Sequence, residues 1–364
     1  MRSFAYVYPQ HSSIISESQR TELTQPGETF EIEGGVVMEV QEPFEPKVDT
    51  DFPTDLNLQK PLIPHIFHQT HKSEYIPLVN VKNVRSLLHH NPSWQYYFWT
   101  DETARELIKQ KHPYLLVLYD NFINPVERSD LLRYVVLYEM GGVYLDTDVE
   151  VRRPLDRVTY KYACIIAHEP FEHASVLYRL EFMVTNAIMM CGAGHPFLAR
   201  LLKNVAGYSA GQGAIERTGP WFVTPEYLKY VQETADKTDP EALLFKHNEP
   251  FAVRGHYVSN NSVYIPNSAY FTHMIDYKQP YLEENCKKNS TEHIVRRGCA
   301  LLRSQAWKLP SRYEFTRHHW VHTWSHVENW SAFKRWYSSF NDRLFGNRGI
   351  HIKQLIPTYK NVAR

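Results

Sequence analysis

Two aspartates, two positions apart, are the residues of this chain best suited to chemistry. Asp146 and Asp148 lie in the segment VYLDTDVEV, which runs from Val143 to Val151. Hard divalent cations such as Mn²⁺ and Mg²⁺ prefer oxygen ligands and often take one or two carboxylates together with phosphate oxygens of a substrate. The spacing therefore predicts that Asp146 and Asp148 hold a divalent ion, which would stabilise a leaving diphosphate.

An Asp-x-Asp pair is also common in solvated turns, so its context matters. The segment 143–151 alternates in hydropathy, which predicts a strand with both aspartates on one side, on the strand or at its end. A helix is predicted from Pro125 to Glu139, ended by Gly141 and Gly142. Asp130 and Arg133 lie three residues apart on that helix and share a face. These two residues are therefore further catalytic candidates.

The elements that must position these residues alternate along the chain. An apolar run at 62–70 predicts a first strand, and the helical pattern at 81–90 predicts a helix that stops at Asn91-Pro92. An aromatic strand is predicted at 94–100. It is followed by a helix at 101–112 that is capped by Thr100 or Asp101. Further helices are predicted at 195–205 and 225–235, the second after a turn at 218–222. This order is typical of an α/β domain with a largely parallel sheet flanked by helices.

Composition shifts suggest three parts. Residues 1–60 are acidic and contain prolines, which predicts an extended leader or stem. Residues 61–330 are predicted to form the catalytic domain, and residues 331–364 a basic helix and tail. The chain has 40 basic and 40 acidic residues, and this zero net charge argues against a general nucleic-acid binder. No apolar run reaches the roughly 18 residues that span a bilayer and no signal peptide is evident, so we expect a soluble chain whose membrane anchor, if one exists, lies outside it.

Cysteines and sequons bear on the compartment. The chain has four cysteines without a CxxC pair, so neither a disulfide framework nor a structural metal is expected. His318 and His322 are four apart, but no HExxH motif accompanies them, so zinc is not predicted. The sequons at Asn260, Asn289 and Asn329 permit a secretory lumen.

Five segments carry a resemblance to a known family. The chain resembles the glycosyltransferases of family 32, typified by the yeast initiating α-1,6-mannosyltransferase and the inositol phosphoceramide mannosyltransferases. More distantly it is similar to the glucosylating clostridial toxins and the α-1,4-galactosyltransferases. The segments are PHIFHQT (64–70), SDLLRYVVLYEMGGVYLDTDVEV (129–151), Asn186 with GHP (194–196), TGP (218–220) and HHWVHTW (318–324).

The resemblance implies a GT-A-type nucleotide-sugar-binding fold and a donor site. His68 and Gln69 would lie under the base, and Asp130 and Arg133 would hold the donor sugar. Asp146 would contact the ribose or sugar and the metal, with Asp148 as the direct metal ligand. The remaining donor-binding residues implied in this way are Tyr134, Asn186, His319, Thr323 and Trp324.

The function implied is that of a metal-dependent retaining glycosyltransferase that uses Mn²⁺ or Mg²⁺. It would move a hexose, whether mannose, galactose or N-acetylglucosamine, from a GDP- or UDP-sugar to a glycan or glycolipid. The family and the sequons together predict a Golgi lumen setting.

Two other functions are compatible with the aspartate pair. A haloacid-dehalogenase-type phosphatase also places Asp-x-Asp after an apolar strand, but it wants Thr or Val where this chain has Glu150, and it leaves Asp130 and Arg133 unexplained. A catalytically silent glycan- or nucleotide-binding domain is the third hypothesis, and the presence of both aspartates and Arg133 argues against it.

Overall fold

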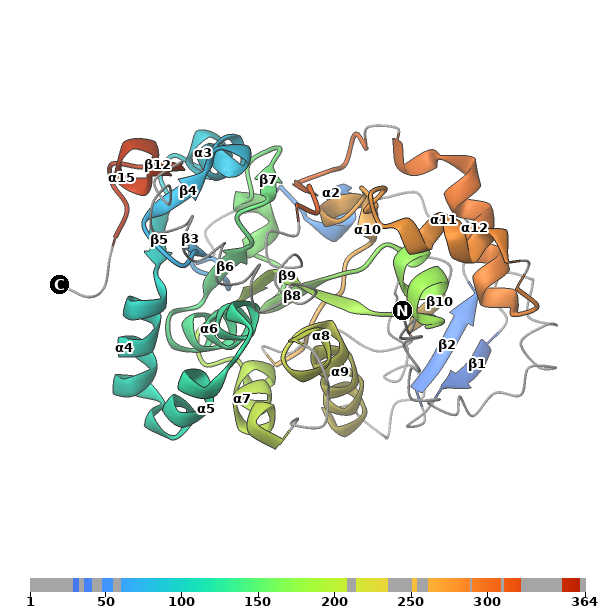
Figure 1. The fold of residues 1–364 in the computed structure, drawn as a ribbon, viewed down its shortest axis with the longest axis horizontal. Helices are drawn as coiled ribbons and strands as arrows, with labels where there is room; N and C mark the ends of the chain where they lie inside the picture. The colour runs from blue at the N-terminus through green and yellow to red at the C-terminus, as the bar shows by residue number, and fades with distance from the viewer. Residues whose placement is uncertain are drawn as a thin grey trace, which may run out of the picture.

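The computed structural model describes residues 29–32, 36–40, 48–54, 60–207, 214–234, 251–253, 261–288, 290–308, 311–321 and 349–360. Its centre is a five-stranded sheet in the order β5 (Gln95–Trp99), β3 (Ile66–Thr70), β6 (Gly142–Leu145), β9 (Val184–Cys191) and β8 (Cys164–His168) (Figure 1). Strand β3 pairs in parallel with β5 and β6, whereas β9 runs antiparallel to both β6 and β8. The predicted α/β class is confirmed, and the sheet is partly parallel.

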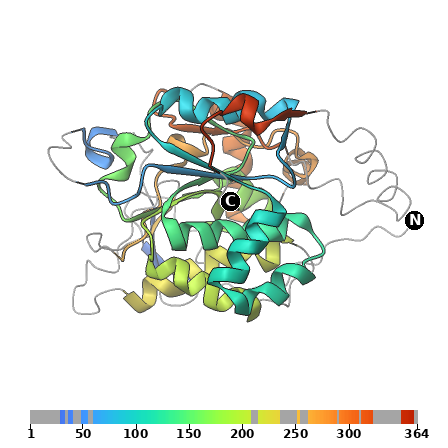
Figure 2. The ribbon, with the colours of Figure 1, turned by 90° about the vertical axis from the view of Figure 1, so that its left-hand side faces the viewer.

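Helices cover both faces of this sheet (Figures 1 and 2). On one face lie α4 (Asp101–Lys111), α5 (Leu116–Asn121), α6 (Pro125–Met140), α7 (Pro196–Asn204) and α9 (Pro220–Thr234). On the other face lie α3 (Val81–His90) and α15 (Ile352–Leu355). Successive side chains of β6 pack into the hydrophobic cores on opposite faces of the sheet. Tyr144 packs with the first set of helices, and Val143 and Leu145 pack with the second.

The helix boundaries follow the local signals of the sequence. Thr100 accepts a hydrogen bond from the Thr103 amide and caps α4, and Asn124 caps α6 with Pro125 in its first turn. Helix α6 ends where Gly141 takes a φ of 64°. The helices predicted at 81–90, 101–112, 125–139 and 195–205 are thus confirmed. The turn predicted at 218–222 is shorter, because α9 already begins at Pro220.

The strand predicted over 143–151 is two strands separated by a turn. Strand β6 ends at Leu145 and β7 (Val149–Val151) begins after Asp148. The Val149 amide donates to the Asp146 carbonyl at 3.0 Å, which closes the turn. Aspartate favours turns, and here that preference overrides the alternating pattern. Strand β7 then pairs antiparallel with β11 (Thr316–His318).

The cysteine expectation was wrong, because Cys164 is bonded to Cys191 and Cys286 to Cys299. The first pair lies at opposite register positions of the antiparallel strands β8 and β9, and the second joins α11 (Pro280–Lys287) to α12 (His293–Ser304). Both pairings are produced by the tertiary arrangement, which the spacing of four cysteines does not reveal.

Parts of the predicted leader and tail are structured. Strands β1 (Thr29–Ile32) and β2 (Val36–Val40) form a small sheet with β10 (Phe251–Val253), and the Phe52 side chain is fully buried after α2 (Val48–Asp51). Strand β12 (Gly349–His351) pairs with β4 (Tyr75–Pro77). The domain boundaries at residues 60 and 330 remain predictions.

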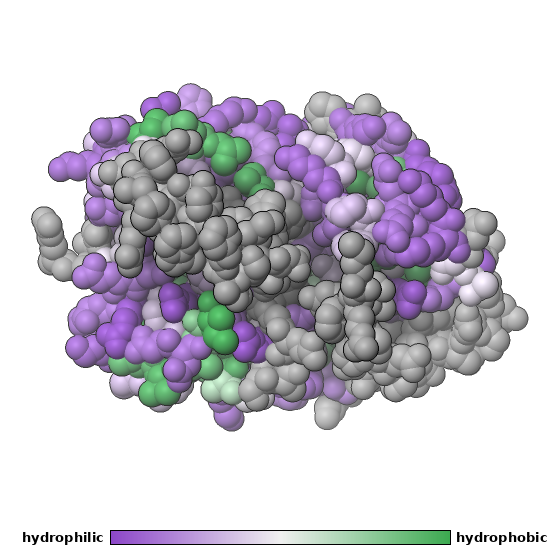
Figure 3. Space-filling model, in the orientation of Figure 1, coloured by the Kyte–Doolittle hydropathy of each residue, from purple (hydrophilic) through white to green (hydrophobic). Residues whose placement is uncertain are grey.

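The remaining elements are short. They are η1 (Leu78–Asn80), η2 (Pro113–Leu115), η3 (Asp156–Thr159), η4 (His173–Leu177), η5 (Val205–Gly207), α8 (Ala214–Arg217), α10 (Ser268–Phe271) and η6 (Ala306–Lys308). On the face shown in Figure 3, hydrophobic residues form small areas within a mostly hydrophilic surface. None of the helices in the described part of the chain combines the length and the apolar character that crossing a bilayer requires.

Candidate active site

Three side chains converge at the turn that follows β6. Asp146 and Asp148 lie on this turn and His318 on the neighbouring strand β11, and each offers an atom within 4.8 Å of the atoms that the others offer. Two carboxylates and one imidazole form a ligand set that suits Mn²⁺, so the residues present fit the predicted divalent ion. His318 was not predicted for this role. It is brought to the turn by the pairing of β11 with β7, which the sequence does not show.

The Asp148 side chain is fixed by the loop after β11. The Val321 amide donates to Asp148 Oδ2 at 2.9 Å, and the His319 amide donates to the Asp148 carbonyl at 3.0 Å. His318 Nε2 lies 3.4 Å from Asp148 Oδ1. Asp148 is therefore held from three directions with its carboxylate facing His318.

Arg133 connects the predicted metal pair to the predicted sugar-binding residues. Its side chain is only 2% exposed, and Nη2 lies 2.9 Å from Asp130 Oδ1 and 3.3 Å from Asp146 Oδ1. Its guanidinium packs over the Tyr144 ring, 4.5 Å from the centroid. Burial lowers the pKa of Arg133, but Asp146, Tyr144 and Asp130 outweigh it and the pKa is raised overall. Arg133 is thus a permanent, oriented positive charge beside the turn.

Asp130 anchors the other side of this cluster. Its Oδ1 accepts from Asn186 Nδ2 at 2.9 Å and its Oδ2 from the Thr218 hydroxyl at 2.7 Å. Asn186 Nδ2 also lies 3.1 Å from the Tyr134 hydroxyl, which donates to the Thr218 carbonyl at 2.5 Å. Burial raises the pKa of Asp130 to about 6, against the lowering effect of Arg133. Four of the residues that the resemblance places at the donor sugar therefore form one hydrogen-bonded cluster with Thr218.

His68 and Gln69 lie on β3 beneath the turn. His68 Nε2 donates to the Gly141 carbonyl at 2.9 Å, its Nδ1 accepts from the Trp99 indole at 3.2 Å, and burial lowers its pKa to about 4. Gln69 Nε2 donates to the Asp146 carbonyl at 3.2 Å. Both ring nitrogens of His68 are thus used within the protein, and contact of either residue with a base remains a prediction.

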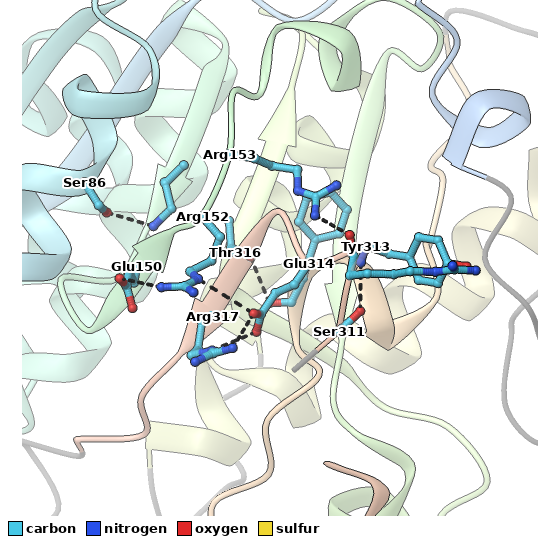
Figure 4. A network of polar contacts seen from close by, with 12 residues as sticks. Ser86, Glu150, Arg152, Arg153, Ser311, Tyr313, Glu314, Thr316 and Arg317 are labelled. Atoms are coloured by element: carbon cyan, nitrogen blue, oxygen red, sulfur yellow. Dashed lines mark hydrogen bonds and ion pairs between the residues drawn. The ribbon is translucent and has the colours of Figure 1, made fainter. Parts of the chain in front are cut away.

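His319 joins an ionic network on the outer face of β7 and β11. Its Nε2 donates to Glu150 Oε2 at 3.0 Å, and Lys82 Nζ lies 2.9 Å from Glu150 Oε1. Burial raises the pKa of Glu150, but the opposing effect of Lys82, His319 and Arg152 is larger and lowers this pKa to about 2. Figure 4 shows how Arg152 links Glu150 to Glu314. This network fastens the strand that carries His318 to the strand that follows Asp148.

Two predicted donor residues, Thr323 and Trp324, lie outside the described residues, as do the acceptor asparagines of all three sequons. Among the described residues, the arrangement places a fixed cation and three side chains that could hold a metal ion at one end of the sheet. Such a site can bind and stabilise a phosphate group that departs from a sugar.

Comparison with known proteins tests the resemblance to a glycosyltransferase family. Residues 77–171 match the glycosyltransferase sugar-binding region containing the DXD motif. The resemblance predicted from the sequence is thereby confirmed for this region, which contains β5, α6, β6 and the turn with Asp146 and Asp148. The partly parallel α/β sheet of this DXD protein fits the GT-A-like fold predicted for it.

Two yeast proteins are similar to this chain over part of their length. The chain is 33% identical over 171 residues to inositol phosphoceramide mannosyltransferase 3 of Schizosaccharomyces pombe, covering 46% of this chain and 45% of the relative. It is 33% identical over 185 residues to mannosyl phosphorylinositol ceramide synthase SUR1 of Saccharomyces cerevisiae, covering 48% of this chain and 46% of that relative. The chain thus aligns with about half the length of these relatives. The solved PaToxG glycosyltransferase is 17% identical with a TM-score of 0.38, over 47% of this chain and 70% of that chain.

Proposed function

We propose that this DXD protein is a metal-dependent, retaining glycosyltransferase that moves a mannosyl group from a nucleotide sugar to a glycolipid acceptor. The observation that carries the proposal is the meeting of Asp146, Asp148 and His318 beside the buried Arg133. The names of the relatives support mannose as the sugar and an inositol phosphoceramide as the acceptor class.

The geometry supports a chemical role for each of these residues. Asp146, Asp148 and His318 would hold a divalent ion, which supplies positive charge to the departing diphosphate. Arg133 stays charged and points at Asp146, so it stabilises negative charge on the donor without reorganising. Asp130 orients Arg133 through the ion pair between them and is itself held by Asn186 and Thr218.

In the proposed front-face transfer the acceptor hydroxyl attacks the sugar carbon on the side from which the diphosphate leaves. The bond from that carbon to the phosphate oxygen breaks, the bond to the acceptor oxygen forms, and the acceptor proton passes to a leaving phosphate oxygen. This route needs no carboxylate nucleophile, which agrees with the use of Asp130 and Asp146 as partners of Arg133.

A ligand panel tests the donor. We expect one of the GDP- or UDP-sugars to raise the melting temperature in the presence of Mn²⁺, because a ligand that binds only the folded state at 100 times its Kd adds about 2.7 kcal/mol. The same sugar should be turned over with release of its nucleoside diphosphate, and EDTA should stop the reaction. Phosphate release from a generic phosphomonoester would instead favour the phosphatase hypothesis, and binding without turnover the silent domain.

The Golgi lumen is the proposed compartment. The two disulfides among the described residues are typical of an oxidising compartment, and the three sequons are compatible with it. Expression of the full-length gene product in a eukaryotic cell should give a chain whose mass falls on endoglycosidase treatment. An unglycosylated product in the cytosol would contradict this assignment.

A further inference from the structure

The turn that carries Asp146 and Asp148 is supported by hydrogen bonds from side chains of three other segments. Asn80 Nδ2 donates to the hydroxyl of Thr147, the residue between the two aspartates, at 3.0 Å. Gln69 Nε2 donates to the Asp146 carbonyl, and the Tyr96 hydroxyl donates to Gln69 Oε1 at 2.8 Å. The turn is thus tied both to the start of α3 and to the strands β3 and β5.

These supporting residues are buried and therefore rigid. Asn80 is 2% exposed, Gln69 is fully buried and Tyr96 is 1% exposed. Burial raises the pKa of Tyr96 well above its ordinary value, so its hydroxyl keeps the proton that it donates to Gln69. The chain from Tyr96 through Gln69 to the Asp146 carbonyl is a fixed line of hydrogen bonds.

Asn80 is the best residue of the three for a test, because its side chain does not cap the helix that begins beside it. It occupies the N-cap position of α3, where asparagine ordinarily bonds to an amide of the first turn, yet its side chain makes no such bond. Its Oδ1 is buried without a hydrogen-bond partner in the described part of the chain. A buried polar atom in that state costs free energy, so this oxygen does not stabilise the fold. The amide nitrogen of Asn80 donates its hydrogen bond to the turn.

We infer that Asn80 is a positioning residue, which orients the metal-binding turn through Thr147, with Gln69 and Tyr96 fixing the Asp146 carbonyl beside it. The inference rests on the proposed function. The three contacts fix the backbone and the middle side chain of the turn, so the two carboxylates face His318 before an ion arrives. Substitution of residues that orient metal ligands in this way typically lowers metal affinity or activity by about 10–100-fold.

The test exchanges Asn80 for leucine, which has the same branched arrangement of side-chain heavy atoms and removes the unpartnered oxygen. Binding of Mn²⁺ is measured by electron paramagnetic resonance in the presence of GDP or UDP, and thermal unfolding is followed without metal. We expect Asn80→Leu to weaken Mn²⁺ binding by roughly tenfold while the melting temperature stays the same or rises. A merely structural asparagine would show a lower melting temperature with unchanged metal affinity.

Asn91, at the other end of α3, is the matched control. Its Nδ2 donates to the Leu87 carbonyl at 2.9 Å and its Oδ1 accepts from the Leu155 amide at 2.7 Å, so both ends of its amide are satisfied. Asn91→Leu should lower the melting temperature and leave the Mn²⁺ affinity unchanged. The two substitutions are thus expected to give opposite patterns.

A second variant tests the route through Thr147. Thr147→Val removes the hydroxyl that Asn80 binds, and the double variant with Asn80→Leu should bind Mn²⁺ about as weakly as either single variant, because both remove one contact. Full additivity of the two losses, or an unchanged Mn²⁺ affinity in Asn80→Leu, would overturn the inference while the wild type still binds the ion. Absence of Mn²⁺ binding to the wild type would overturn the proposed metal dependence as well.

Discussion

Asp148 is the residue on which the predicted metal chemistry depends most directly. It receives the Val321 amide on Oδ2 and has His318 beside Oδ1, so its side chain is already oriented. Its neighbour Asp146 is shared with Arg133. The two aspartates therefore have different surroundings, and their removal is expected to have different consequences.

Asp148→Asn should abolish metal-dependent turnover and leave the fold intact. The amide keeps the shape and an oxygen that can accept from the Val321 amide, but it loses the charge that a hard cation requires. Sugar transfer should fall by at least 100-fold at saturating donor, with the melting temperature changed by only a few degrees. Glu106→Gln, whose side chain on α4 is 45% exposed, should behave like the wild type. An unchanged rate in Asp148→Asn would refute the assignment.

Arg133→Lys tests the need for a planar cation. Lysine cannot reach Asp130, Asp146 and the Asn186 carbonyl together, so buried acceptors would lose their partner. We expect kcat/KM to fall by about 100-fold or more and the free energy of unfolding to fall by about 3 kcal/mol. In the control Arg105→Lys, at an exposed pair with Asp120, the stability should stay close to that of the wild type. Urea denaturation and initial-rate kinetics separate the two effects.

At the scale of elements, the junction between α6 and β6 determines where the site residues lie. Gly141 ends the helix with a positive φ, its carbonyl accepts from His68, and β6 then leads directly to Asp146. Asp130 and Arg133 on the helix thus face the turn after a single short strand. The sequence signalled this junction with its two glycines.

Gly141→Ala should therefore destabilise the whole domain. A Cβ at this position would lie 2.6 Å from the Ala193 amide nitrogen and 2.9 Å from Pro64 Cδ, on a backbone whose φ is +64°. We expect the free energy of unfolding to fall by at least 2 kcal/mol, since both strain and steric overlap oppose the methyl group. Gly207, whose added Cβ would meet nothing within 4 Å, is the control for substitution in a short helical turn. Equal melting temperatures for the two variants would contradict this explanation.

At the scale of the whole molecule, three buried histidines make the fold sensitive to acid. Burial lowers the pKa of His68, His168 and His195 to about 4 in each case. A base with a depressed pKa is stabilising above its unfolded pKa of 6.5, and this contribution is lost as the pH falls towards 4, because the unfolded chain binds the protons. Asp130 and His318, whose pKa values are raised, partly offset this loss.

His195→Asn isolates one of these histidines. His195 Nδ1 accepts from the Phe197 amide and caps α7, and asparagine is a good N-cap, so the helix start is preserved. The free energy of unfolding of the variant should depend less on pH between 6.5 and 4, by up to about 1.4 kcal/mol per pH unit. Urea titrations at several pH values measure this slope. A slope equal to that of the wild type would contradict the role assigned to His195.

Elements with strong local signals, and the chemical type of the site, could be predicted from the sequence alone. Asn124 with Pro125, Thr100 and the glycine pair at 141–142 fix helix ends through contacts within a few residues, so α4 and α6 could be predicted. The aspartate pair and the Asp130–Arg133 spacing are likewise local, and they pointed to a metal and a phosphate.

The distant residues that complete the site could not be predicted, because the folding of the chain brings them together. His318 joins the aspartates through the pairing of β7 with β11, Thr218 reaches Asp130 from the start of α9, and Cys164 meets Cys191 across β8 and β9. Asn80 and Gln69 support the turn from two further segments. Such contacts depend on strand order and register, which arise from packing of the whole sheet and leave no periodic or spacing signal in the sequence.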